Sequence, residues 1–186
     1  HRWGKQIFFM GISILGIGLF WMQKDHYKAY QKWNKAQMFY NNKAYEAALE
    51  VYEPLYPLLK HKPEFLFEAA QSLSKTGRYE KANEYLERAI LLSSDPMLYY
   101  VMAKNEQCLG EYRQAEKHLL HAIDILPERI YPYYLLMNLY TEPSYFQPAK
   151  LKMAIDSVLT KKPKVESSAI KEMKEKARSM LNNTSI

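Results

Sequence analysis

Apolar residues in the central part of the chain recur at helical spacing, and the same arrangement returns after 33 residues. The segments 77–82 (GRYEKA) and 110–115 (GEYRQA) each stand ahead of such a pattern, formed by Leu86 and Ala89 in the first copy and by Leu119 and Ala122 in the second. In each copy Gly permits the sharp turn that ends one helix, and the small Ala lets the next helix lie close against its partner. The pattern therefore predicts stacked pairs of helices.

Two further copies extend the array to four. One period earlier the helical positions are filled by Tyr45, Ala48, Tyr52 and Leu55, although Asn42 and Lys43 stand where a Gly is expected. One period later apolar residues fill a first helix and a second helix (Tyr133, Leu136 and Tyr140, then Leu151, Ile155 and Val158). We place the four copies at about residues 29–62, 63–95, 96–129 and 130–163.

Small, aromatic and proline positions agree together at several fixed offsets, and Pro127 and Pro163 close the last two copies. This combination resembles the tetratricopeptide repeat (TPR), a helix-turn-helix unit of about 34 residues, over roughly residues 30–163. The resemblance implies an all-α fold, a TPR-like α-solenoid.

Some segments modify the regular pattern. Pro54 and Pro57 fall inside the second helix of the first copy, and we expect that helix to kink or stop near Glu53 because proline removes a helical hydrogen bond. Asp95 and Pro96 form a cap that opens the third copy. The turn of the fourth copy, residues 141–148, is two residues longer than its counterparts.

A last helix is expected to close the array. Ser167 and Ser168 can cap a helix that reaches about Leu181 and carries apolar residues on one face (Ala169, Met173, Ala177 and Met180). Repeat arrays need such a terminal helix with a polar outer side. We therefore interpret residues 164–186 as a capping helix with a fraying tail from Asn182 onward.

An apolar stretch precedes the repeats. Every residue from 7 to 22 except one Ser is apolar or Gly, and Trp3 and Trp21 flank the run. The 20 residues that begin at Trp3 would form about 30 Å of helix, which matches the hydrocarbon core of a bilayer. Residues 1–23 are therefore predicted to hold a transmembrane helix (residues 3–22), continuous with the first repeat helix of residues 25–40.

A signal peptide is the alternative for this stretch, because Arg2 and Lys5 resemble a charged leader. Bulky residues end the run and no small-residue cleavage site follows, which favours the transmembrane helix.

A basic stripe follows the apolar stretch and is formed by Lys24, Lys28, Lys32 and Lys35. It fits a solvated helix face or contact with anionic headgroups, and under the positive-inside rule it favours cytoplasmic repeats.

The resemblance to TPR proteins also implies a binding face. In that family the fifth and ninth positions of each first helix point into a concave groove. These positions form an aromatic column (Trp33, Phe67, Tyr100 and Tyr134) and a polar column (Gln37, Gln71, Lys104 and Asn138). Aromatic rings and amides suit an extended segment, so we expect a protein or peptide partner here. The alternative is that the rings only pack between helices.

The remaining residues show no pattern typical of catalysis. Cys108 is the one cysteine, which excludes an intrachain disulfide and a cysteine-based zinc cluster. His118 and His121 lie one helical turn apart, with Asp124 beyond, but two His ligands are too few for a zinc site. Since no phosphate loop or nucleophile motif occurs, we predict no catalytic residue, metal or cofactor. The pI near 9.1 permits nucleic-acid binding, but no matching motif supports an RNA-binding solenoid.

The apolar stretch together with residues 27–36 (YKAYQKWNKA) and 52–57 (YEPLYP) resembles the C-terminal end of Bacteroidetes O-antigen ligase or polymerase-type proteins. The resemblance implies a repeat tail on a glycan-transferring membrane enzyme of lipopolysaccharide biosynthesis, in the bacterial inner membrane. Its catalytic Arg and His would lie upstream of His1, and we expect the chain to be an excerpt of such a protein. The alternative is a stand-alone membrane-anchored scaffold or assembly adaptor.

Overall fold

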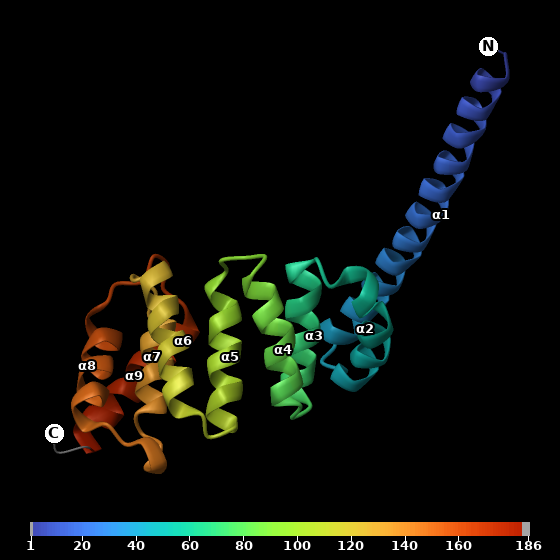
Figure 1. Ribbon diagram of the computed structural model, residues 1–186. Coiled ribbons are helices and arrows are strands. Elements are labelled where there is room, and N and C mark those ends of the chain that lie inside the picture. Colours follow the sequence, from blue (N-terminus) through green and yellow to red (C-terminus); the bar gives the residue numbers. More distant parts are fainter. Residues whose placement is uncertain (1, 184–186) are drawn as a thin grey trace.

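The computed structural model describes residues 2–183, which form a stack of paired helices (Figure 1). The first pairs are α1 (Arg2–Asn41) with α2 (Tyr45–Leu59) and α3 (Pro63–Lys75) with α4 (Tyr79–Ile90). The next are α5 (Pro96–Cys108) with α6 (Tyr112–Ile125) and α7 (Tyr131–Leu139) with α8 (Pro148–Thr160). A short 3₁₀ helix, η1 (Pro143–Tyr145), precedes α8, and α9 (Ser168–Asn183) ends the stack. No strand occurs in this part of the chain, and the predicted all-α solenoid is confirmed.

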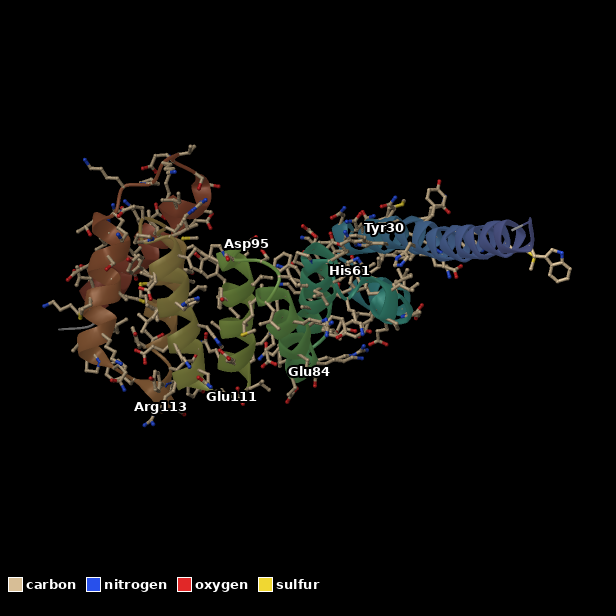
Figure 2. All side chains as sticks on the ribbon, turned by 45° about the horizontal axis from the view of Figure 1, so that its top comes forward. Tyr30, His61, Glu84, Asp95, Glu111 and Arg113 are labelled. Atoms are coloured by element: carbon tan, nitrogen blue, oxygen red, sulfur yellow. The ribbon has the colours of Figure 1, made fainter. Side chains whose placement is uncertain are left out.

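The helices lie in two layers. Each odd-numbered helix contacts the next odd-numbered one, from α1 to α9, and every helix also packs against its neighbours in sequence. The hydrophobic core has two clusters that meet at α5, where Leu98 and Met102 face the first cluster and Tyr100 and Ala103 face the second. Connections between pairs lie along one edge of the stack, marked by Asp95 in Figure 2, and turns within pairs along the opposite edge.

The turns within the first three pairs share one backbone geometry. Gly77 and Gly110 have φ angles of 79° and 78°, and Lys43 takes the same region with a φ of 60°. The amide after each of these residues donates to a carbonyl five residues back, as from Arg78 to Leu73 at 2.9 Å. Lys43 therefore takes the role of the missing Gly, although a side chain in this region costs about 1–2 kcal/mol.

Helix α2 was expected to kink or stop near Glu53; it does not stop there, because it continues through Pro54 and Pro57 to Leu59. Both prolines are exposed. The opposite face of α2 is buried through Tyr52, Leu55 and Leu59. Burial of such side chains contributes about 1.5–3 kcal/mol each, which offsets the cost of about 3 kcal/mol that each proline imposes inside a helix.

The capping helix α9 packs against α7 and α8. The Oγ of Ser167 accepts a hydrogen bond from the Ile170 amide at 3.3 Å, so Ser167 caps the helix as expected. Ala177 is fully buried, but Ala169 is exposed, and the buried face begins at Ile170, one residue later than predicted. Of the tail expected to fray, Asn182 and Asn183 belong to α9, and residues 184–186 lie outside the described chain.

Helix α1 is continuous over 40 residues, and its first half extends away from the stack (Figure 1). Within the described residues, no helix has both the length and the hydropathy that crossing a bilayer requires. The transmembrane prediction for residues 3–22 falls on side chains that, apart from Trp3, Met10 and Gly18, lie outside those described.

Gly110→Ala is expected to lower the free energy of unfolding by about 1–2 kcal/mol, because a Cβ is unfavourable at this φ angle. No atom lies within 4 Å of the added Cβ, so steric overlap does not contribute. Lys43→Gly at the equivalent turn is the matched control, and we expect it to leave stability unchanged or raise it by up to about 1 kcal/mol. Denaturant unfolding followed by circular dichroism measures both, and equal losses would contradict the prediction.

Candidate functional site

The eight predicted groove residues all lie on the layer of odd-numbered helices. Trp33 and Gln37 are on α1, Phe67 and Gln71 on α3, Tyr100 and Lys104 on α5, and Tyr134 and Asn138 on α7. Because these helices contact one another in order, both predicted columns run along one layer of the stack. The two ends of this layer differ in how far their polar groups are already paired.

At the α1–α3 end, the Glu68 carboxylate accepts three hydrogen bonds. Trp33 donates to it at 2.6 Å, Gln37 at 2.8 Å and Tyr52 at 3.0 Å. Burial, followed by the negative charge of Glu68, raises the pKa of Tyr52. Glu68 could not be singled out from the sequence, because its donors come from 16 to 35 residues away along the chain.

Gln71 is also engaged at this end. The hydroxyl of Tyr40 donates a hydrogen bond to its Oε1 atom. Trp33, Gln37 and Gln71 therefore join α1 to α3, and these polar groups are committed to the repeat stack itself. Phe67 is half-buried and makes no such bond, because its side chain is a hydrocarbon.

At the α5–α7 end, aromatic rings form a continuous run over two odd-numbered helices, α5 and α7. Tyr100 meets Tyr131 edge to face at 5.2 Å between ring centroids, and Tyr131 lies nearly parallel to Tyr134 at 6.4 Å. The ammonium of Lys176 on α9 lies over the Tyr134 ring at 5.4 Å. Tyr131 and Tyr134 are partly exposed and Lys104 is exposed, so this run offers contact area to a partner.

Two predicted groove residues carry buried polar atoms without a partner. In the described part of the chain, these atoms are the hydroxyl of Tyr100 and the Oδ1 atom of Asn138. Burial raises the pKa of Tyr100, which keeps its hydroxyl protonated. Leaving a buried polar group unpaired costs about 1–3 kcal/mol, and native structures contain few of them. The α5–α7 end thus has hydrogen-bonding capacity that the repeats do not use.

A second carboxylate, Glu116 on α6, organises the long turn of the fourth pair. It accepts hydrogen bonds from Tyr140 at 2.6 Å and from Tyr145 and Lys150 at 2.7 Å. Burial alone would raise the pKa of Glu116, but the bonds from Lys150 and the two tyrosines outweigh it and lower the pKa. The sequence predicted the longer turn but not the residue that holds it in place.

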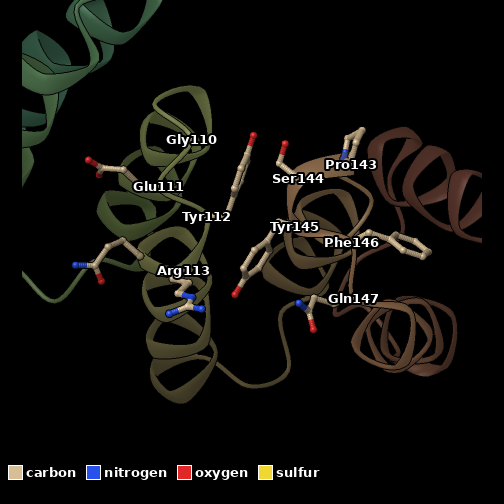
Figure 3. Close-up of a pocket in the computed structure, with 10 residues that line it drawn as sticks. Gly110, Glu111, Tyr112, Arg113, Pro143, Ser144, Tyr145, Phe146 and Gln147 are labelled. Carbon is tan, nitrogen blue, oxygen red and sulfur yellow. The ribbon is translucent and has the colours of Figure 1, made fainter.

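The long turn also forms one wall of an open pocket of about 820 Å³ (Figure 3). The other wall is the turn from α5 to α6, and the rings of Tyr112 and Tyr145 stack across the pocket at 5.6 Å. Phe146 lies at its edge and is 51% exposed. The described lining residues include Ser144 but no His or Asp.

The two histidines singled out in the sequence both lie beside the Tyr99 ring, but they have different nearest partners. His118 Nδ1 lies 2.8 Å from Oε2 of the buried Glu106, and the ring of His121 packs against Tyr99 at 4.7 Å. Among the residues that the structure describes, no group of three or more His, Cys, Asp or Glu is placed to hold a metal ion.

Comparisons with known proteins agree with this geometry. A family model described as anaphase-promoting complex, cyclosome, subunit 3 matches residues 41–122. MamA from Desulfovibrio magneticus RS-1 has a similar structure, with a TM-score of 0.65, 19% identity, and coverage of 86% of this chain and 98% of that chain. A Podosopora anserina kinesin light chain protein with TPR-like repeats gives a TM-score of 0.61, 15% identity, and coverage of 84% and 88%.

A further similar structure is that of the Yersinia enterocolitica type III secretion chaperone SycD in complex with a peptide of the translocator YopD. Its TM-score is 0.50 and its sequence identity is 16%, with coverage of 81% of this chain and 92% of that chain. No curated protein matches the chain in sequence. The chain is a TPR-like repeat protein. The family model and these structures do not name an O-antigen ligase, so that resemblance stays a prediction.

Glu116→Gln is expected to lower the free energy of unfolding at pH 7 by about 1.5–3 kcal/mol, because it removes the charge that three donors stabilise. The native fold lowers the Glu116 pKa below its ordinary 4.5, so this stability is present above pH 4.5 and is lost as pH falls through the native pKa. The difference between wild type and variant should therefore narrow on acidification.

Denaturant unfolding across a pH series measures this difference. Glu111→Gln is the matched control, because Glu111 is exposed at the start of the same helix and makes no side-chain cap bond. Its effect is expected to stay within about 0.5 kcal/mol. A wild-type to Glu116→Gln difference that is constant with pH would show that the carboxylate charge contributes nothing.

Proposed function

We propose that the repeat stack is a protein–protein interaction module that binds an extended segment of a partner along its odd-numbered helices. The observation that carries this proposal is the pair of buried, unpaired atoms on Tyr100 and Asn138. A main chain in extended conformation presents alternating N–H and C=O groups. Asn138 Oδ1 can accept from the first, and the Tyr100 hydroxyl can donate to the second, after small side-chain rotations.

The contrast between the two ends of the layer supports a binding site centred on α5 and α7. At the α1–α3 end, Glu68 and Gln71 already pair the polar groups. At the α5–α7 end, partly exposed Tyr131 and Tyr134 lie beside exposed Lys104. Because SycD, a protein of similar fold, is seen with a bound peptide, the fold itself is compatible with this use.

We also propose that residues 3–22 anchor the module in the bacterial inner membrane, as the tail of an O-antigen ligase or polymerase-type protein of surface-glycan assembly. The support is the apolar sequence of this stretch and its continuity with the first repeat helix. A stand-alone anchored scaffold is the second candidate. The coding sequence upstream of His1 separates them, because further hydrophobic spans favour the ligase tail and a nearby start codon favours the scaffold.

Tyr100→Phe and Asn138→Ala are expected to weaken binding of selected peptides about threefold to tenfold while changing the free energy of unfolding by less than about 1 kcal/mol, because the Tyr100 hydroxyl and the Asn138 Oδ1 atom have no partner in the free protein. The probes are peptides selected by the full chain from a random nonapeptide library, and fluorescence anisotropy measures their affinity. Tyr27→Phe is the matched control on exposed α1. Equal affinities for all three variants, or a library without binders, would contradict the proposal.

Replacing Ile12 and Leu15 by Arg is expected to move the protein from the membrane to the soluble fraction, since each charge near a bilayer centre costs about 2.5–3.5 kcal/mol. Fractionation of bacterial cells followed by an alkaline carbonate wash measures the distribution. Tyr27→Arg, in the exposed part of α1 beyond the apolar stretch, should remain in the membrane fraction. Release of the wild-type protein by carbonate would refute the proposed membrane anchor and would leave the groove proposal unaffected.

A further inference from the structure

A small cavity opens on the odd-numbered layer between the first turns of α3 and α5. Its volume is about 250 Å³, and it includes Phe67, the predicted groove residue that makes no hydrogen bond within the stack. Sites for drug-sized ligands usually measure about 300–1,000 Å³. This cavity therefore suits a single side chain of a longer ligand.

The walls of the cavity carry negative charge. Glu64, Glu68 and Asp95 line it, and none of its described lining residues is basic. This is unlike the chain as a whole, whose formal net charge is +6. A cavity with this charge on an otherwise basic protein attracts cations and repels acidic side chains.

The described contacts of these carboxylates are with neutral groups. The three donors to Glu68 are a Trp, a Gln and a Tyr side chain, all neutral. Asp95 accepts from the Met97 amide at 2.9 Å as the cap of α5. In the described part of the chain, no ion pair involves Glu64, Glu68 or Asp95. Glu68 is only partly exposed, so solvent compensates its charge incompletely.

The apolar part of the cavity decides which cation fits. Phe67 and Leu98 supply an aromatic ring and an aliphatic side chain next to the carboxylates. The methylene stem of Lys or Arg packs on apolar surface, and its charged end is attracted both by carboxylates and by a ring face. A metal ion fits less well, because the described carboxylates include no group of three placed to hold one.

We propose that this cavity is a specificity pocket for an Arg or Lys side chain of the bound partner segment. The inference rests on the proposed function, because it supplies the residue type that the groove selects. The stem of the basic side chain lies against Phe67 and Leu98, and its charged end pairs with Glu64 and Asp95. Glu68, which hydrogen bonds from α1 and α2 hold in place, adds a negative potential to the cavity.

A positional-scanning library of N-acetylated, C-amidated nonapeptides tests this inference on the full chain in detergent. We expect one position at which Arg or Lys improves binding at least fivefold over Leu and over Glu. In the double variant Glu64→Gln, Asp95→Asn this preference should fall below twofold while preferences at other positions remain. Asn is itself a good helix cap, so α5 keeps its cap in the variant.

Glu84→Gln is the matched control, because it removes one exposed carboxylate from the middle of the even-numbered helix α4, outside the cavity lining, and should keep the preference (Figure 2). Phe67→Leu gives a second readout, since it should reduce the preference while keeping the carboxylates. Peptides that bind without a basic preference, or a preference that survives the double variant, would overturn the pocket but leave the groove proposal intact. A library without any binder would overturn both.

Discussion

Close contact between paired helices at buried alanines is the constraint on which the rest of the structure depends. Ala48, Ala82 and Ala115 occupy the same place in the second helix of three successive pairs, and all three are fully buried. A larger side chain at such a crossing would push the two layers apart, because protein interiors are packed too tightly to absorb it. The alignment of the odd-numbered helices, and of the predicted groove residues on them, follows from this spacing.

Two carboxylates then fix the parts of the stack that alanine contacts leave loose. Glu68 ties α1 and α2 to α3, and Glu116 ties α7, η1 and α8 to α6. Each accepts several hydrogen bonds at once, so removing either one leaves several donors unpaired. These residues stabilise the first and last pairs, whereas α5 in the middle is held mainly by the two hydrophobic clusters on its opposite faces.

The repeated phrase of Gly, aromatic and Ala residues was sufficient to predict the all-α stack, because those residues act locally at each turn and crossing. The course of α2 through Pro54 and Pro57 was not predictable in this way, since it depends on packing against other helices. The predicted groove residues all lie on the odd-numbered helices, yet the bonds of Trp33 and Gln37 to Glu68 were missed. Contacts between residues some 30 positions apart leave no periodic trace in the sequence.

The unbroken course of α1 has a mechanical consequence. A helix of 40 residues is about 60 Å long, and it enters the first repeat without a loop at which the two halves could swivel. Any contact that holds the first half of α1 in place therefore also sets the orientation of the repeats. Turning or tilting the first half of α1 would therefore reorient the first repeat, and the helices stacked on it, in the same direction.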